Sequence, residues 1–294
     1  MADTTNLANT AWLGVDEKSL DLQNPLIHRS HDEIKRPDLH LLRLMRDPKY
    51  IGFAAKVLLN IELLPVQIAV LRELWVRPFP MFVASRGFGK SWLMSVYAML
   101  KCALIPETKV VIVGAAFRQS KIIFEYMETL WRNAPILRSI CDTNSGPRRD
   151  VDRCTMRINN SWAIAVPLGD GQKIRGLRAH TIIADEFASI PPDIYETVVA
   201  GFAAVSASPV QNVKEAAKRD ELKKQGLWTQ ALEDRYKSKR TNQAIISGTA
   251  DYDFKHFADY WKRYRSIVES KGDEHKLSQI FGEEIPEGFD WRDY

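Results

Sequence analysis

The chain has 294 residues, of which 45% are hydrophobic and 27% are charged, and its formal net charge at pH 7 is +4. These are ordinary values for a globular protein with a sizeable core. No apolar run approaches the ~18 residues of a membrane span, and the polar N-terminus lacks the features of a secretory signal. The three cysteines show no CxxC spacing, which argues against a disulfide framework or a zinc site. We therefore expect a cytoplasmic protein with no membrane partner.

The first part of the chain changes from polar to helical. Residues 1 to about 40 show little periodicity and have the composition of an arm rather than a core. From Leu41 to Trp75 the apolar residues recur at helical spacing, and Pro65 should open a new helix. Strands and helices then alternate. Short apolar runs predict buried strands at Met81–Ala84, Lys109–Gly114, Thr181–Ala184 and Gln243–Ser247.

Helical spacing predicts helices at Ser91–Leu104, Arg118–Trp131, Ile194–Val205, Val213–Arg240 and Asp253–Ser270. In the second of these helices, the apolar stripe is formed by Ile122, Tyr126 and Leu130. A hairpin is predicted from Thr155–Ile158 and Trp162–Val166, with Asn159-Asn160-Ser161 as the turn. Strands that alternate with helices indicate an α/β fold with a parallel sheet covered on both faces.

The segment between the first strand and the next helix has the pattern of a phosphate-binding loop. Its backbone N–H groups and the helix N-terminus would offer oriented donors to phosphate oxygens. Lys90 would reach the β and γ phosphates, and the Ser91 hydroxyl would bind magnesium. Ala84 stands where the usual G-x-x-x-x-G-K-[ST] pattern has its first glycine. The expected phosphate-binding residues are Ser85, Arg86, Gly87, Phe88, Gly89, Lys90 and Ser91.

Two carboxylates follow the predicted strand Thr181–Ala184. Asp185, at the end of a buried strand, can hold magnesium through a water molecule. Glu186, one residue further on, would orient and deprotonate the attacking water. An apolar run that ends in Asp-Glu is a weak signal alone, but it gains weight after a phosphate-binding loop.

Gln67 lies shortly before the phosphate-binding loop, in the sequence Leu64-Pro65-Val66-Gln67. A glutamine amide can both accept from and donate to the N6/N7 edge of adenine. The alternative is an exposed polar residue at the start of a helix, and the residues alone leave both interpretations open.

Together, and in this order, the motifs resemble the ATPase domain of large terminase subunits, the DNA-packaging motors of tailed phages and herpesviruses. That family typically has [ST]-R-x-x-G-K-[ST], a pattern that Ser85–Ser91 matches. It also has a Ser/Thr-rich coupling motif on the strand after the one that ends in the two carboxylates, followed by an aromatic helix. Here Ser247-Gly248-Thr249-Ala250 precedes an aromatic segment. The resemblance covers roughly Leu64 to Arg265.

The resemblance implies a RecA-like P-loop core that uses ATP and Mg²⁺. It assigns adenine contact to Gln67, phosphate and metal contacts to Lys90 and Ser91, the metal to Asp185 and the water to Glu186. Thr249 would sense the γ-phosphate and couple hydrolysis to movement. An arginine must also neutralise the charge that develops on the phosphoryl group. Arg86 and Arg175 are the two candidates, and Arg175, in a glycine-rich segment, is the one expected to act on a neighbouring subunit.

The function implied by this resemblance is ATP hydrolysis that drives double-stranded DNA into a viral procapsid. Such a motor would assemble as a homo-oligomeric ring on the portal protein in the host cytoplasm and would meet the small terminase subunit. The basic segment 214–240, together with Arg148 and Arg149, is the candidate surface for DNA phosphates.

The predicted organisation is an N-terminal arm (1–50), a P-loop core (51–250) and a lid or linker (251–294), without the nuclease domain that large terminases usually carry. Two other functions compete with the motor. A superfamily-2 helicase fragment also combines a glutamine, a phosphate-binding loop and Asp-Glu, but it needs a second RecA-like domain. A nucleotide-binding assembly adaptor that does not hydrolyse ATP would not need Lys90, Ser91, Asp185 and Glu186 intact.

Overall fold

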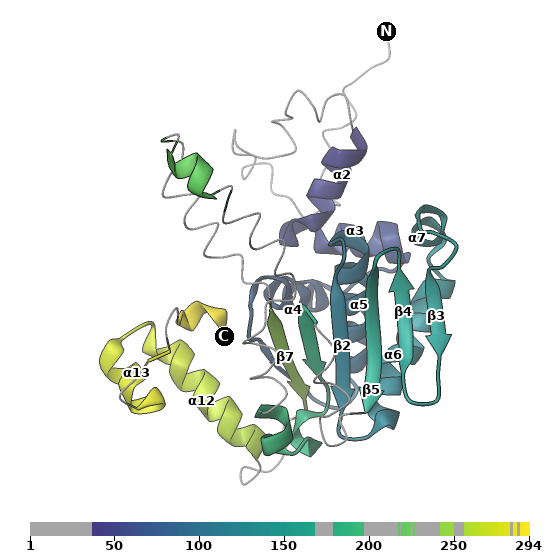
Figure 1. Cartoon of the computed structure of the whole chain (residues 1–294). Helices are drawn as coiled ribbons and strands as arrows, with labels where there is room; N and C mark the ends of the chain where they lie inside the picture. Colours follow the sequence, from purple (N-terminus) through teal and green to yellow (C-terminus); the bar gives the residue numbers. More distant parts are fainter. Residues whose placement is uncertain are drawn as a thin grey trace.

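The protein is described by a computed structural model over residues 37–167, 179–196, 217, 219–224, 226, 242–249, 256–282, 285–286 and 289–294 (Figure 1). The predicted N-terminal arm therefore lies mostly outside the described residues. The helices are α2 (Pro37–Arg46), α3 (Ile51–Leu59), α4 (Pro65–Val76), α5 (Lys90–Leu104), α6 (Phe117–Arg132), α7 (Pro135–Ile140), α12 (His256–Ser270) and α13 (Glu274–Phe281). The strands are β1 (Met81–Val83), β2 (Lys109–Gly114), β3 (Gly146–Arg149), β4 (Cys154–Ile158), β5 (Ser161–Pro167), β6 (Thr181–Ala184) and β7 (Gln243–Gly248).

The strands form one 7-stranded sheet in the order β1-β7-β6-β2-β5-β4-β3. Strands β1, β7, β6, β2 and β5 run parallel, and β4 and β3 are antiparallel additions at one edge. The predicted α/β class with a parallel sheet is confirmed, and so is the β4–β5 hairpin with its turn at Asn159 and Asn160. Strand β3 was not predicted, because Gly-Pro-Arg-Arg has no apolar alternation to reveal it.

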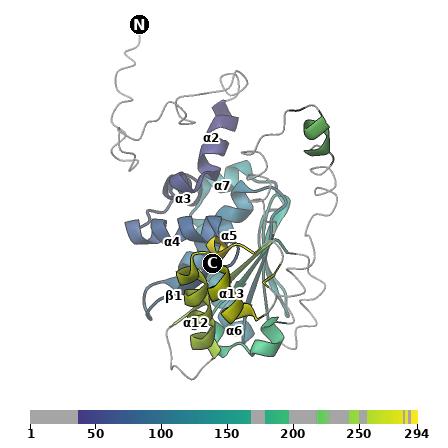
Figure 2. The same cartoon turned by 90° about the vertical axis from the view of Figure 1, so that its left-hand side faces the viewer.

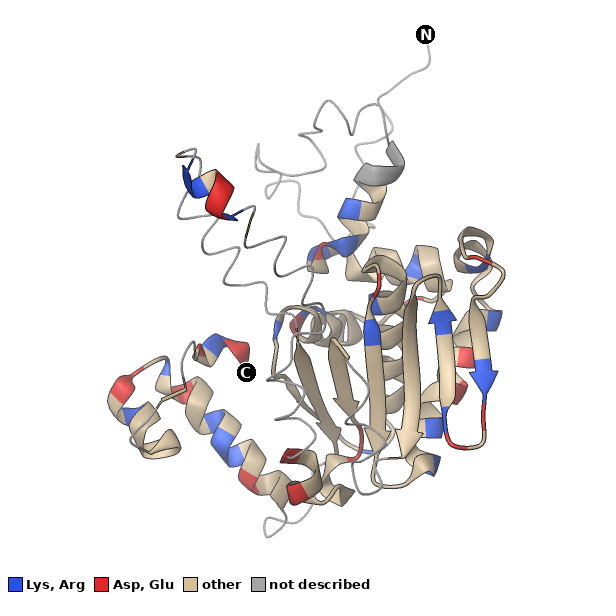
Figure 3. Cartoon of the chain, in the orientation of Figure 1, with Lys and Arg blue, Asp and Glu red and all other residues tan. Residues whose placement is uncertain are grey.

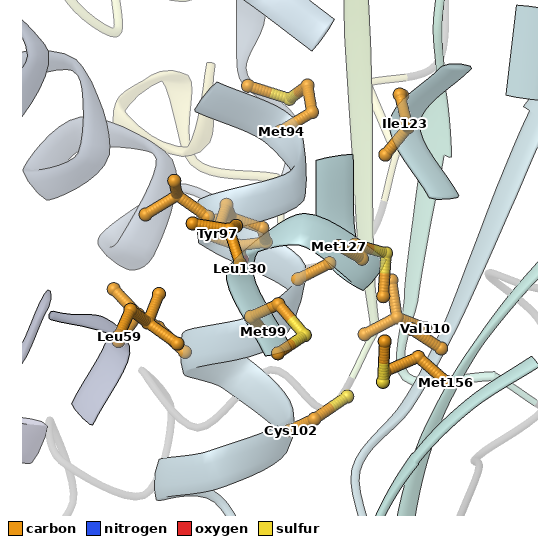
Figure 4. Packing of buried hydrophobic residues seen from close by; sticks show 14 of the residues in the cluster. Leu59, Met94, Tyr97, Met99, Cys102, Val110, Ile123, Met127, Leu130 and Met156 are labelled. Atoms are coloured by element: carbon orange, nitrogen blue, oxygen red, sulfur yellow. The ribbon is translucent and has the colours of Figure 1, made fainter. Parts of the chain in front are cut away.

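Both faces of the central strands β2, β6 and β7 are buried, as their nearly continuous apolar sequences require. In β2, Val110 and Ile112 belong to one core cluster, whereas Val111 and Val113 belong to another. Helices α5 and α6 cover the first face, where Met99, Met127 and Met156 pack together with their neighbours (Figures 2 and 4). On the second face, the cluster is completed by aromatic residues from short segments after β6 and from α12.

Helix α6 corrects one sequence prediction. Of the proposed stripe, only Leu130 is buried, while Ile122 and Tyr126 are each 40% exposed. The buried side is formed by Ser120, Ile123, Phe124, Met127 and Leu130. The helix carries two apolar stripes at similar spacing, and the sequence does not say which one faces the sheet. Contact with α5, β2 and β5 selects the stripe that contains Phe124 and Met127.

The C-terminal helices lie beside the β1 and β7 side of the sheet (Figure 1). Helix α12 begins at His256, and the predicted start at Asp253 falls outside the described residues. A final 3₁₀ turn at Trp291–Asp293 returns to the segment before β1, where Phe79 N–H donates to the Asp293 carbonyl at 2.8 Å. Arg77 also donates to the Tyr294 carbonyl at 2.7 Å. Among the described helices, none combines the length and apolar character needed to cross a membrane.

Candidate nucleotide-binding site

The sequence motifs meet at one edge of the sheet, where the parallel strands β1, β7 and β6 end side by side. The loop 84–89 follows β1, Thr249 follows β7, and Asp185-Glu186 follows β6. Because the carboxyl ends of parallel strands share an edge, segments far apart in sequence are brought together there. This edge is the expected ligand position in an open α/β sheet.

The loop after β1 depends on two glycines. Gly87 and Gly89 both have φ near +86°, a left-handed conformation that residues with a Cβ rarely adopt. A Cβ at either position would meet no atom within 4 Å, so the backbone angle and not space requires glycine. Helix α5 begins directly after Gly89, with Leu93 N–H bonded to the Gly89 carbonyl. The loop thus presents the N-terminus of a long helix, the usual anion-binding geometry.

Lys90 is a buried cation with uncharged partners. The residue is 7% exposed, and its Nζ donates to Thr249 Oγ1 at 2.8 Å. It also lies 3.3 Å from the Ala84 carbonyl and 3.4 Å from the Ser85 carbonyl. These three partners are neutral oxygens. A nearby negative charge stabilises a buried ammonium group, so Lys90 is suited to bind an anion held by the loop.

Asp185 is held from two sides. Its Oδ2 accepts from Ser91 Oγ at 2.8 Å, and its Oδ1 accepts from Ser247 Oγ at 3.0 Å. Asp185 is 2% exposed and Ser247 is fully buried. Ser91 and Asp185 therefore place a hydroxyl and a carboxylate together beside the loop. Oxygen donors of this kind are the ligands that Mg²⁺ prefers, so the pair fits the metal that the motifs imply.

Glu186 has an unusual backbone conformation. It is half-buried and has φ 49° and ψ 49°, the left-handed region that is uncommon for residues other than glycine. The residue turns the chain sharply from β6 into a 3₁₀ turn at Phe187–Ser189. Uncommon conformations of this kind collect at functional sites, where the surrounding structure holds them in place.

A family model described as "Terminase large subunit, T4likevirus-type, N-terminal" matches residues 81–259, which is more than half of the chain. The chain belongs to this family. The match includes the loop, Asp185-Glu186 and Thr249, so the family resemblance drawn from the motifs is confirmed. No curated protein matches the sequence.

Several solved structures resemble the terminase chain. The HK97 bacteriophage large terminase is 15% identical, with a TM-score of 0.49, and the match covers 72% of this chain and 38% of that one. The large terminase of a thermophilic bacteriophage in complex with ADP is 14% identical, with a TM-score of 0.36 and coverage of 63% and 38%. The Thermus phage P74-26 large terminase ATPase domain is 16% identical, with a TM-score of 0.37 and coverage of 79% and 97%. The matches thus cover well under half the length of the HK97 protein and of the ADP-bound terminase.

Gln67 has a structural role that the motif alone did not reveal. Its Oε1 accepts from the backbone N–H of Leu64 at 2.9 Å, which satisfies a free donor at the start of α4. The side chain is half-buried. Adenine contact by Gln67 stays a prediction, and any such contact would share or replace this capping bond.

The arginines predicted to neutralise phosphoryl charge or to face DNA lie in different surroundings. Arg86 is exposed on the phosphate-binding loop, whereas Arg175 lies outside the described residues. Arg149 makes a bidentate ion pair with Glu128, at 2.8 and 2.5 Å, and this carboxylate raises the pKa of the guanidinium. Arg148 donates to the Asn144 carbonyl at 3.4 Å. Of the two arginines predicted to face DNA, Arg149 is therefore already engaged with a carboxylate, which weakens that expectation.

The predicted basic segment 214–240 is described only at 217, 219–224 and 226. In the rest of the described chain, Lys and Arg positions include several on the β3–β4 hairpin, α2 and α12 (Figure 3). Two residues at this edge have contacts that the sequence did not predict, since Ser247 was named only as part of the coupling motif and His256 was given no role. Ser247 holds Asp185 from β7, and His256 contacts the residue after Glu186. For Ser247, the sequence did offer a signal, because a polar residue at the end of an apolar strand suggests a buried polar contact.

Proposed function

We propose that this terminase chain hydrolyses ATP to ADP and phosphate and that hydrolysis drives double-stranded DNA into a viral procapsid. The observation that carries the proposal is the pair of side-chain contacts Lys90–Thr249 and Ser91–Asp185. They bring together residues from the phosphate-binding loop, the coupling motif and the acidic strand. A helicase or an adaptor has no comparable support from the family match.

In the proposed reaction, Lys90 exchanges its neutral oxygen partners for the β and γ phosphates. Ser91 and Asp185 would hold Mg²⁺, which would neutralise phosphate charge. Glu186 takes a proton from the attacking water as its oxygen bonds to the γ-phosphorus, and the bond from that phosphorus to the ADP oxygen breaks. Thr249, which accepts a hydrogen bond from Lys90, would respond when phosphate draws the lysine away.

The candidates for the arginine that neutralises the transferring phosphoryl group are chosen by their positions in the sequence. Arg86 belongs to the loop of its own subunit, and Arg175 is the candidate for a neighbouring subunit in a homo-oligomeric ring. Mixing Arg175→Ala with Lys90→Ala, each inactive alone, tests this assignment under assembling conditions. Recovered activity supports an arginine that acts between subunits, whereas no recovery with assembly confirmed by light scattering returns the role to Arg86.

The proposed partners are double-stranded DNA, the portal protein, the small terminase subunit and further copies of the chain. The deciding experiment is phosphate release by the purified protein with ATP and Mg²⁺, with and without double-stranded DNA. Turnover that requires Mg²⁺ and is lost in Lys90→Ala supports the proposal. Absence of turnover with retained ATP binding would favour the adaptor, and separation of tailed duplexes would favour the helicase.

A further inference from the structure

Phe187, the residue after Glu186, is held tightly although it lies outside the long helices and the sheet. Phe187 is fully buried, and its ring centroid lies 4.6 Å from Tyr195, 5.0 Å from Tyr260, 5.2 Å from His256 and 5.9 Å from Phe257. Each pair packs edge to face, the arrangement that the aromatic quadrupole favours. The side chain of Phe187 is thus enclosed by rings, three of which come from α12.

The backbone of Phe187 is anchored as well. Its carbonyl accepts from Ile190 N–H at 2.9 Å and lies 3.0 Å from His256 Nε2. Because a carbonyl oxygen can only accept, the proton on this histidine must be on Nε2. The two donors use both lone pairs of the oxygen. His256 is therefore a specific hydrogen-bond partner from α12 and not only another ring in the cluster.

Glu186 stands between two fixed neighbours. On one side, Asp185 N–H bonds to the Val113 carbonyl at 3.0 Å, and its carboxylate is held by Ser91 and Ser247. On the other side, Phe187 is held by the ring cluster and by His256. The left-handed conformation of Glu186 has no glycine to favour it, so these two anchors must maintain it.

Helix α12 also touches the strand that carries the coupling motif. A Cβ on Gly248 would lie 3.0 Å from two ring carbons of Phe257 and 3.6 Å from the backbone nitrogen of Phe187. The absence of a side chain at Gly248 lets the Phe257 ring lie against the end of β7. The first turn of α12 therefore meets the chain beside Glu186 and beside Thr249 together.

We propose that His256 is a positioning residue for Glu186. Its Nε2–H holds the Phe187 carbonyl, and this bond keeps the preceding residue in the conformation that directs its carboxylate. The inference rests on the proposed function, in which Glu186 accepts the proton of the attacking water. It makes α12 part of the catalytic apparatus, although no residue of α12 touches the phosphate-binding loop through the contacts described above.

The test compares His256→Ala with His256→Gln, in which the glutamine Nε2 can replace the imidazole donor. His256→Ala should lower kcat about tenfold, because small misplacements of a catalytic group are costly, while KM for ATP and the affinity for ADP stay within about threefold. His256→Gln should recover most of kcat. His275→Ala, which changes an exposed histidine on α13, is the matched control and should retain normal kcat. Melting temperatures confirm that each variant is folded at the assay temperature.

A second arm shows whether His256 acts through Glu186. In a Glu186→Gln background, adding His256→Ala should change the residual rate by less than about twofold, because the group being positioned is already gone. An equal loss of about tenfold in both backgrounds, or normal kcat in folded His256→Ala, would overturn the inference while leaving the proposed function intact. Normal turnover in Glu186→Gln alone would instead remove the proposed role of Glu186, and the positioning role with it.

Discussion

The two ends of strand β7 lie beside polar groups of opposite character. At its start, Gln243 donates to the carbonyls of Leu74 at 2.5 Å and Arg77 at 2.6 Å, and its Oε1 accepts from the Tyr97 hydroxyl. Every group in this network is neutral. At its other end, the strand lies beside Lys90 and Asp185, two buried charges.

The polar groups at the start of β7 serve stability, whereas those near its other end have the features of a functional site. The Gln243 network ties α4 and α5 to the sheet and leaves no charge unmatched, as a purely structural polar network should. The nucleotide end keeps an ammonium group against neutral oxygens and a glutamate in a left-handed conformation. Such features cost stability and are retained where function needs them. Substitutions at the two ends should therefore have different consequences.

The largest expected effect is that of Lys90→Ala. Turnover should fall about 10³-fold, since the cation that meets the phosphates is lost. The variant should stay folded, because the bonds that the alanine loses are those to the neutral oxygens of Thr249, Ala84 and Ser85. Phosphate release measures the turnover, and thermal unfolding measures the melting temperature. A folded variant that keeps more than about a tenth of the normal rate would contradict the phosphate role.

Glu186→Gln should lower turnover at least about 10²-fold, because the amide keeps the shape but cannot accept the proton. ATP should still bind with near-normal affinity, which a nucleotide titration measures. Loss of affinity together with turnover would place Glu186 among the groups that hold the metal.

At the opposite end, Gln243→Leu should destabilise the fold by about 2 kcal/mol, because the Tyr97 hydroxyl and two carbonyls lose their partner. The folded fraction should keep its kcat. Denaturant unfolding and phosphate release at a temperature where the variant is folded provide the test. A large fall in kcat would show that the two ends are not independent.

Thr249→Ala should lower turnover about tenfold and leave KM for ATP within about threefold, if the hydroxyl acts in coupling rather than in binding. Thr249→Ser keeps the hydroxyl that Lys90 contacts and is the matched control. Unchanged turnover in the alanine variant would reduce Thr249 to an ordinary strand end.

The smallest effect concerns Lys101, on the same side of α5 as the Gln243 network. Burial lowers its pKa to about 8, and its Nζ lies 4.5 Å from the Trp75 ring centroid. Between about pH 8 and the pKa of the unfolded chain, the unfolded state binds a proton that the folded state does not, so this group makes stability rise with pH. Lys101→Met should raise stability by about 1 kcal/mol at pH 7, offset in part by the lost cation–π contact. Thermal unfolding should show that the extra stability of Lys101→Met shrinks as pH rises above about 8. Extra stability that grows with pH would contradict the lowered pKa of Lys101.

Much of this architecture was determined by local sequence. Apolar runs located β2 and β6 at their observed bounds, because a fully buried strand must be apolar along its whole length. The predicted phosphate-binding loop was recognisable because the pattern Ser85–Ser91 lies between a predicted strand and a predicted helix, and its Gly87 and Gly89 adopt a conformation that other residues avoid. Asp185 and Glu186 were placed correctly at the end of β6, because the chain must leave a buried strand where polar residues begin.

Other features were decided only by tertiary packing. The sequence of α6 permits two apolar stripes, and contact with the sheet chose the one with Phe124 over the one with Tyr126. The pairing of Asp185 with Ser247, and of Phe187 with His256, joins residues far apart along the chain through the order of strands and the docking of α12. No local pattern encodes these contacts. They arise because the fold brings separate segments to one edge of the sheet, where each buried polar group must find a partner.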